Sequence, residues 1–217
     1  MQHFRNFLKV LQPAVTVTLV LMLVCGLGYP LLLNGLSGLL FPDQAKGSLV
    51  MVDGKAIGSE HVGQEFTEDY FMKSRPSAVH YNTYTVDEAG KAVYSDGSEF
   101  TGLASGSSNY GPSNPALAQR VEEDMAAFLA ANPDARAEEI PTDLLTASGS
   151  GLDPHVSPAS AAIQLPGIAR ASGLSMETLE QIVQENTTGR LFGIFGEETV
   201  NVLGVNADIA QAMGLMQ

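Results

Sequence analysis

The chain has 217 residues, which is enough for one domain with an appendage but not for two full domains. Residues 10–42 carry no charged side chain, whereas residues 43–217 carry all 24 acidic and nine of the eleven basic residues, a formal charge of −15. Because so acidic a region repels nucleic-acid phosphates and anionic lipid headgroups, we exclude nucleic-acid binding and peripheral docking on such membranes.

The uncharged stretch predicts a transmembrane helix over residues 11–33. Its apolar centre, residues 14–33, has 20 residues, and at about 1.5 Å per residue it matches the ~30 Å hydrocarbon core of a bilayer. Arg5 and Lys9 precede it, so the positive-inside rule predicts a cytoplasmic N-terminus over residues 1–10 and an extracytoplasmic acidic domain over residues 34–217. A cleaved signal peptide is disfavoured because no small-residue cleavage site follows.

Proline and glycine set local expectations within this helix. Pro13 is expected near the helix start, where its missing N–H has little effect. The two threonines of the segment can hydrogen-bond back to the preceding turn. Gly26, Gly28 and Pro30 are expected to loosen or kink the outer third, which a membrane helix tolerates when another helix packs there.

Beyond the helix, turn and cap residues separate short elements. Residues 48–52 (SLVMV) predict a strand that enters a turn at DGK, and residues 87–111 predict a long loop or a weak hairpin. Asn114, followed by proline, predicts the start of a helix with apolar residues at helical spacing. Asn132, again followed by proline, is expected to end that helix.

Two further helices are predicted from the same signals. Ser157, followed by proline, opens a helix that runs toward Arg170, with Pro166 inside it or ending it early. Ser175 caps the next helix, and Gly189 is expected to stop it in a left-handed conformation.

The C-terminal segment predicts two strands, at residues 191–195 (LFGIF) and 199–205 (TVNVLGV), and a closing helical turn over residues 207–213. Short helices mixed with a few strands, without regular β-α alternation, are typical of the α+β class. The predicted fold is therefore an α+β outer domain tethered by one N-terminal transmembrane helix.

The sequence lacks the usual patterns of catalytic and nucleotide-binding sites. Gly54-Lys55 and Gly90-Lys91 lack the other residues of a phosphate-binding loop, and residues 147–151 do not form a nucleophile elbow. Asp153 and His155 could share a metal ion, but turn and capping chemistry explains Asp153 better. We therefore expect no catalytic residue, no metal site and no activity of its own. The alternative is a membrane-tethered extracytoplasmic protein that binds a small ligand or cation through Asp153, His155 and nearby acids.

Three loops rich in glycine, serine, proline and asparagine remain, at residues 74–78, 106–115 and 146–154. Such loops occur where the chain bends tightly or approaches another molecule closely. Ordinary turns and a rigid surface for docking a partner both fit this pattern. The candidate docking residues are Arg75, Pro76, Ser77, Asn109, Asn114, Ser148, Ser150, Asp153 and His155.

Ordered motifs along almost the whole chain resemble one known family. They include Gly47-Ser48-Leu49, the segment VGQEF at residues 62–66, RPSA at 75–78, GPSNP at 111–115, PTDLLTASGSGLDPHVSP at 141–158 and VNVL at 200–203. In these motifs the chain resembles the C subunit of the bacterial Kdp complex, a potassium-importing P-type ATPase.

The resemblance implies a non-catalytic accessory subunit in the bacterial inner (plasma) membrane. Its implied partners are a channel-like potassium-translocating subunit, a P-type ATPase subunit, a small single-helix subunit and membrane lipid. In this family the C subunit is described as a catalytic chaperone that raises the ATP affinity of the ATPase subunit. Firmly bound cofactors are not expected: ATP acts through the ATPase subunit and potassium is the transported ion. The resemblance also implies nucleotide binding at Gln164, with Arg170 as the local cation.

Overall fold

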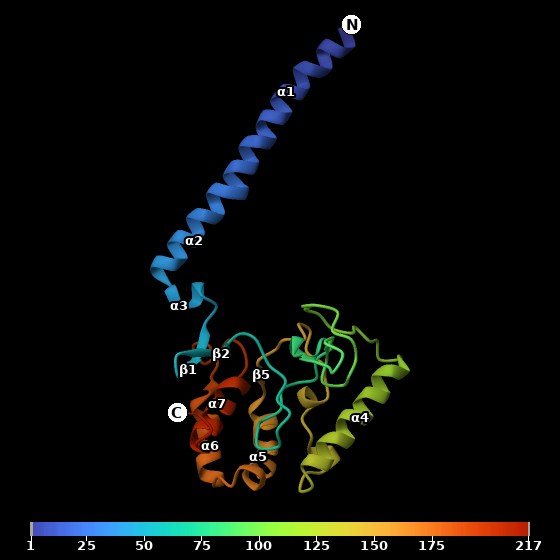
Figure 1. The fold of residues 1–217 in the computed structure, drawn as a ribbon, viewed down its shortest axis with the longest axis vertical. Helices are drawn as coiled ribbons and strands as arrows, with labels where there is room; N and C mark the ends of the chain where they lie inside the picture. Colours follow the sequence, from blue (N-terminus) through green and yellow to red (C-terminus); the bar gives the residue numbers. More distant parts are fainter. Residues whose placement is uncertain (1, 217) are drawn as a thin grey trace. The chain divides into compact units, whose positions relative to one another are not determined.

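The computed structural model describes the backbone of residues 2–216 and the side chains of residues 9–216. The chain divides into two compact units, residues 1–48 and residues 49–217 (Figure 1). The first unit is a helical rod and the second is an α+β domain. The predicted fold class, an α+β domain with one apolar N-terminal helix, is confirmed.

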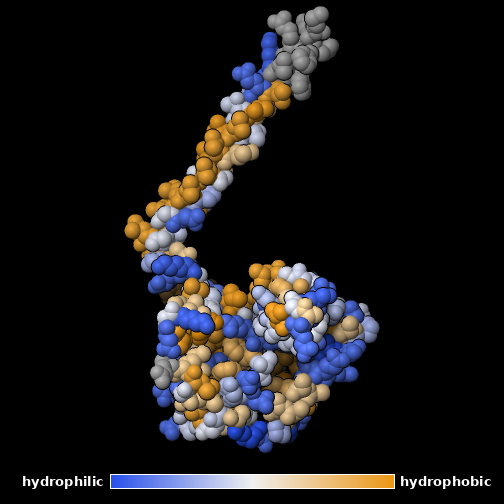
Figure 2. Space-filling model, viewed as in Figure 1, coloured by the Kyte–Doolittle hydropathy of each residue, from blue (hydrophilic) through white to orange (hydrophobic). Residues whose placement is uncertain are grey.

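The rod consists of α1 (Gln2–Leu23), a π-helical segment η1 (Val24–Gly28), α2 (Tyr29–Leu40) and a short α3 (Pro42–Ala45). Lys9–Leu40 forms a helical run of 32 residues that is long and apolar enough to cross a membrane, and its side chains are exposed along the rod (Figure 2). A transmembrane helix needs only about 20 residues. Among the described residues, this is the one candidate span.

The local expectations for the rod are met in two cases and wrong in one. The hydroxyls of Thr16 and Thr18 donate to the carbonyls of Gln12 and Ala14, both at 2.9 Å. The glycine-rich segment before Pro30 takes a π-helical turn, as expected of helical hydrogen bonding loosened at such a site. The position of Pro13 was wrongly predicted: α1 begins at Gln2, so this proline lies inside the helix and interrupts its hydrogen bonding there.

The strands of the domain are short and antiparallel. β1 (Leu49–Val52) is the predicted strand entering a turn, and it pairs across that turn with β2 (Lys55–Ser59), which was not predicted. β3 (Thr85–Val86) pairs with β4 (Ala92–Val93) in a short hairpin whose first strand lies before the region 87–111, where a long loop or a weak hairpin was expected. A third sheet has the order β5-β7-β6, formed by His155–Val156, Thr199–Asn201 and Thr187–Thr188. Its central strand places Val200 in the core with no exposed surface.

Four helices complete the domain: α4 (Pro115–Ala131), α5 (Pro158–Ser172), α6 (Met176–Glu185) and α7 (Val202–Ala212). The predicted N-caps are confirmed, because Asn114, Ser157 and Ser175 accept from the backbone N–H groups of Ala116, Ser160 and Thr178 at 3.0–3.1 Å. Single 3₁₀ turns lie at His80–Asn82 (η2), Ala137–Glu139 (η3) and Thr142–Leu144 (η4). The helix from Ser157 reaches Ser172 with Pro166 inside it.

The core of the domain lies around β7 and the buried faces of α5, α6 and α7. Its most buried apolar side chains are Met72, Val156, Ala161, Leu179, Val200, Val202, Val205 and Ile209. Met72 reaches this core from a segment without regular structure, and it is fixed there by the side chain of Asn206. The amide oxygen of Asn206 accepts from the Met72 N–H at 2.7 Å, and its nitrogen donates to the Met72 carbonyl at 2.9 Å.

Three predictions for the C-terminal segment were wrong. Gly189 does not end α6, which stops at Glu185 with Asn186 as its cap, and Gly189 has no positive φ. Leu191–Phe195 is a tight turn closed by one bridge, not a strand. The strand predicted over residues 199–205 ends at Asn201, because the Asn201 side chain accepts from the Gly204 N–H at 2.9 Å and so caps α7. The helix expected at residues 207–213 therefore begins at Val202.

Candidate functional site: an interlocked loop surface

The three loops singled out in the sequence meet in the folded domain. Ser148 donates its N–H to the carbonyl of Pro76 at 3.1 Å, and the Ser77 hydroxyl donates to the carbonyl of Gly151 at 2.7 Å. The N–H of Gly106 donates to the carbonyl of Ser150 at 2.8 Å. Each loop is therefore held by backbone groups of another, although up to 74 residues separate the bonded partners in the chain.

An ion pair joins two of these loops. The Arg75 guanidinium donates to the Asp153 carboxylate at 2.9 Å, and both side chains are about three-quarters buried. Arg75 also donates to the carbonyl of Thr146 at 3.3 Å, and Asp153 accepts from the His155 N–H at 3.0 Å. The pKa of Asp153 is held below its ordinary value, first by the His155 side chain, whose Nδ1 lies 3.7 Å from the carboxylate, and also by the His155 N–H and Arg75, against the opposing effect of burial.

Tyr81, in η2, is hydrogen-bonded to the backbone of this ion pair. Its hydroxyl donates to the carbonyl of Arg75 at 2.8 Å, and its ring is 8% exposed. Burial, and then the negative charge of Asp153, raise the pKa of Tyr81 to about 12, so the hydroxyl remains a hydrogen-bond donor across the physiological range.

Two glycines allow the loops to approach this closely. Gly63 donates its N–H to the carbonyl of Leu152 at 2.9 Å, and a Cβ at this position would lie 2.5 Å from the carbonyl oxygen of Asp153. Gly151 has a φ of +68°, and a Cβ there would lie 2.7 Å from the carbonyl oxygen of Gly106. At Gly63 and Gly151 the backbone of one loop or segment packs directly against the backbone of another, and this close packing fixes the shape of the surface that the loops form.

Seven of the nine candidate docking residues lie together in this loop surface: Arg75, Pro76, Ser77, Ser148, Ser150, Asp153 and His155. Ser148 is 1% exposed and accepts from the Gly151 N–H at 2.8 Å, so it holds the loop from within. Asn114 serves as the N-cap of α4. Asn109 is exposed and has a φ of +52°, a left-handed conformation that asparagine tolerates.

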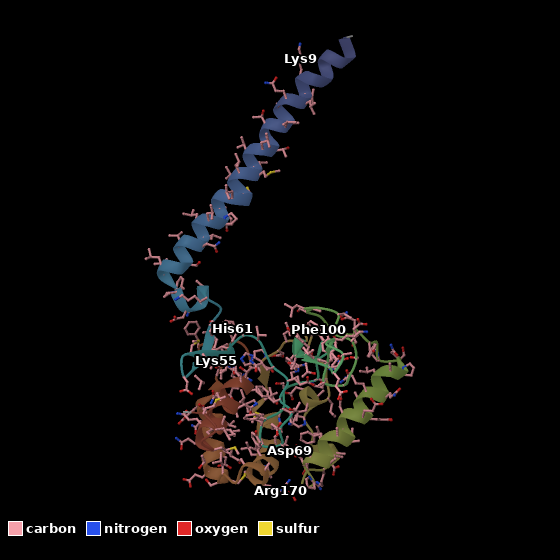
Figure 3. All side chains as sticks on the ribbon, in the orientation of Figure 1. Lys9, Lys55, His61, Asp69, Phe100 and Arg170 are labelled. Atoms are coloured by element: carbon pink, nitrogen blue, oxygen red, sulfur yellow. The ribbon has the colours of Figure 1, made fainter. Side chains whose placement is uncertain are left out.

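Gln164 and Arg170, the residues implied in nucleotide binding, line one pocket of about 240 Å³ with Asp69, Phe71 and Lys73. Asp69 and Arg170 are labelled in Figure 3. Gln164 is 3% exposed. Its side-chain oxygen accepts from the Lys73 N–H at 2.8 Å, and its nitrogen donates to the Ser160 carbonyl at 2.9 Å and the Lys73 carbonyl at 3.3 Å. Arg170 is paired with Asp134. The Gln164 amide thus joins α5 to the segment before the loop surface.

A second pocket of about 410 Å³ lies beside the loop surface, between α4 and residues 65–81. Phe66, Tyr81 and Phe128 provide apolar walls, and Lys73 and Arg75 provide cations. The Nε atom of Arg75 is buried and has no hydrogen-bond partner among the residues that the structure describes. The two pockets share Lys73, whose pKa is lowered by burial.

Several residues of this site were not predicted from the sequence. Lys73 borders both pockets and Tyr81 supports the ion pair, but neither lies in a pattern that indicates a role. Gly63 did carry a signal, since it lies within the segment at residues 62–66 that contributed to the family resemblance. Within residues 9–216, no group of three or more His, Cys, Asp or Glu side chains is arranged to hold a metal ion.

The chain has one apolar helix of membrane-spanning length and a separate α+β domain that carries the loop surface. These features place it in the class of proteins with a candidate membrane anchor and a separate folded domain. Within that class, the family described as "KdpC: K+-transporting ATPase, c chain" matches residues 11–211, so the chain belongs to this family. The resemblance seen in the sequence motifs is thereby confirmed.

Curated relatives agree over nearly the full length. The chain is 57% identical over 210 residues to the "Potassium-transporting ATPase KdpC subunit" of Clostridium kluyveri, covering 97% of each chain. It is 52% identical to the protein of the same name from Clostridioides difficile, covering 96% of this chain and 100% of that protein. The Rhodopseudomonas palustris strain BisB5 protein of that name is 46% identical, with 92% and 95% covered.

Proposed function

We propose that this chain is a non-catalytic accessory subunit of a potassium-importing P-type ATPase in the bacterial plasma membrane. The relatives' names identify them as subunits of a potassium-transporting ATPase, with potassium as the transported ion. In this proposal the domain docks on the channel-like potassium-translocating subunit and thereby promotes ATP use by the ATPase subunit. In the bilayer, the membrane helix of this chain contacts the small single-helix subunit and lipid.

The observation that carries the proposal is the interlocking of three loops into one rigid surface. Loops that order only on binding lose conformational entropy when a partner docks, which weakens the complex. Here hydrogen bonds between Ser148 and Pro76, and between Ser77 and Gly151, hold the loops before any partner arrives. The ion pair of Arg75 with Asp153 adds a third link. Such a preformed surface suits docking onto another protein.

The proposed orientation follows from charge. Two basic residues, Arg5 and Lys9, precede the apolar helix, and the region beyond it carries a formal charge of −15. Basic residues flanking a membrane helix favour the cytoplasmic side. Residues 1–10 would then be cytoplasmic, residues 11–33 would span the bilayer, and residues 34–217 would lie outside.

In this proposal the chain affects ATP use indirectly, without binding ATP itself. The polar atoms of the Gln164 side chain already bond to backbone groups of Lys73 and Ser160, and Arg170 pairs with Asp134. Gln164 then acts by holding the domain in shape, and the effect on ATP affinity passes through contact between subunits. Direct nucleotide binding at Gln164 and Arg170 stays a prediction of the family resemblance.

The test is assembly and ATP dependence of the complex purified in mild detergent. We expect the wild-type chain to copurify with an ATPase subunit, and Gly63→Ala to reduce copurification and raise the apparent KM for ATP. Gly149→Ala is the matched control, because its added methyl meets no atom within 4 Å. Equal assembly and equal KM for the two variants would contradict docking through the loop surface.

The second pocket favours one alternative function, a membrane-tethered protein that binds a small ligand. Its volume of about 410 Å³ lies in the range of about 300–1,000 Å³ usual for small-molecule sites. Arg75 and Lys73, which line this pocket, would supply cationic donors for an acidic ligand. Calorimetric titration of the full chain with small carboxylates would support this alternative if Arg75→Ala abolished the heat of binding.

A further inference from the structure

The turn at Leu191–Phe195 exposes an unusual amount of apolar surface. Phe192 is 84% exposed, Ile194 73%, Phe195 64% and Leu191 63%. Isolated exposed apolar side chains are common on soluble domains, but four large ones within five residues form a patch of the kind that marks an interaction site. The turn has no place in the loop surface described above.

The turn is rigid although it protrudes. Leu191 donates its N–H to the carbonyl of Phe195 at 2.8 Å, and Phe195 donates back to the carbonyl of Leu191 at 3.0 Å. Gly193 donates to the carbonyl of Arg190 at 2.9 Å. Phe192 is left-handed with a φ of +54°, an uncommon conformation for a bulky residue that here projects its ring to solvent.

Both ends of the turn join the core sheet. It connects β6 to β7, and β7 is the central strand that carries the fully buried Val200. A short apolar turn held at its base by a core sheet presents its side chains at low entropic cost. Residues that anchor a protein interface by filling a pocket in the partner share this low entropic cost of ordering.

The charged residues beside the turn indicate which kind of partner it binds. Glu197 and Glu198 follow the turn after Gly196, and Arg190 precedes it, within a domain whose formal charge is strongly negative. Segments that insert into lipid headgroups carry basic residues beside their apolar ones, whereas these carboxylates would be repelled by anionic lipid. A second copy of the chain would be repelled for the same reason. A protein pocket edged by basic residues complements both the apolar tip and its acidic rim.

We propose that residues 190–198 form an anchor loop that inserts Phe192 and Ile194 into an apolar pocket, edged by basic residues, on the extracytoplasmic face of a membrane subunit of the potassium-transporting ATPase. This inference rests on the proposed function, and it names a contact separate from the loop surface. The acidic rim of Glu197 and Glu198 steers the approach, and the two apolar side chains hold the complex.

The test compares full-length variants in detergent for binding to the purified complex of the remaining subunits. We expect Phe192→Ser to weaken binding about tenfold or more, and Phe192→Ser with Ile194→Ser about a hundredfold, as for apolar anchors in other interfaces. Val86→Ser is the matched control, because Val86 is 65% exposed on β3, and its binding should equal the wild type. Phe192→Leu should retain most of the affinity.

The outcomes separate the two proposals. If the wild-type chain itself fails to bind the other subunits, the proposed function fails and the anchor loop fails with it. If the wild type binds and Phe192→Ser binds equally well, only the anchor loop is wrong. Unchanged assembly together with Phe192-dependent binding to phosphatidylcholine vesicles would replace the protein partner by a membrane. Unfolding temperatures of all variants within about 2 °C of the wild type would show that folding is unaffected.

Discussion

Replacing Gln164 by alanine separates a structural role for this residue from a nucleotide-binding one. The substitution removes hydrogen bonds to the Lys73 N–H and to the carbonyls of Lys73 and Ser160. A typical hydrogen bond contributes about 0.5–1.5 kcal/mol net, and a buried donor left unpaired adds about 1–3 kcal/mol. We therefore expect a loss of about 3 kcal/mol. For a domain of this size that lowers the unfolding temperature by roughly 6–12 °C.

The assay is differential scanning calorimetry of the full-length chain in detergent without nucleotide. Gln181→Ala is the control, because this exposed glutamine makes one contact with Glu185 a turn away, which is worth about 0.2–0.5 kcal/mol. If Gln164→Ala unfolds within about 1 °C of Gln181→Ala, the Gln164 amide does not hold the fold. That result would refute the structural role and leave the amide available for a ligand.

Three further predictions concern the loop surface and its supports. Gly63→Ala should destabilise the domain by about 1–3 kcal/mol in chemical unfolding, because its methyl meets backbone, whereas Gly149→Ala should change stability by less than about 0.5 kcal/mol; equal values would contradict the close packing. The pKa of Asp153 is lowered in the folded state, so its contribution to stability is present above its unfolded pKa of about 3.9 and is lost as the pH falls below that value. Asp153→Asn should therefore reduce the fall of the unfolding temperature in that acid range. Parallel curves for the wild type and the variant would argue against the ion pair. Ser157→Ala should lower stability by about 1–2 kcal/mol in urea unfolding, since it removes the cap of α5 and a bond to Asp143; an unchanged midpoint would show that the cap is not needed.

Helix starts could be predicted from the sequence because capping is a local interaction. Asn114, Ser157 and Ser175 each bond to a backbone N–H two or three residues ahead, so the signal and its partner lie in the same short segment. The strand at β1 and the turn after it were predicted for the same reason, since Asp53 and Gly54 supply a left-handed turn.

Two of the errors, at residues 191–195 and 199–205, concern apolar runs whose composition fits both a strand and another structure. The composition of Leu191–Phe195 is typical of a strand, but Gly193, with a φ of +73°, allows a tight turn, and the large side chains of this segment are exposed. The run at residues 199–205 divides at Asn201, and its apolar residues serve first a strand and then a helix because both are buried against the same core. An apolar run cannot by itself distinguish these cases.

The sequence indicated the loops of the site but not their arrangement. The composition of residues 74–78 and 146–154 indicated ordinary turns or a rigid surface for docking a partner; the loops turn on themselves and bond to each other, and docking stays a prediction. The pairing of Arg75 with Asp153 spans 78 residues, and no local pattern specifies it. The position of Tyr81 beneath that pair likewise depends on the complete fold.

The most direct test of the account is the accessibility of a cysteine at Ser108, which lies in an exposed part of the loop surface, in a Cys25→Ser background. We predict that a membrane-impermeant maleimide labels this cysteine from outside in right-side-out membrane vesicles when the chain is expressed alone, and labels it more slowly when the other subunits are present. Labelling that occurs only after the vesicles are opened would contradict both the orientation of the domain and the function proposed for it.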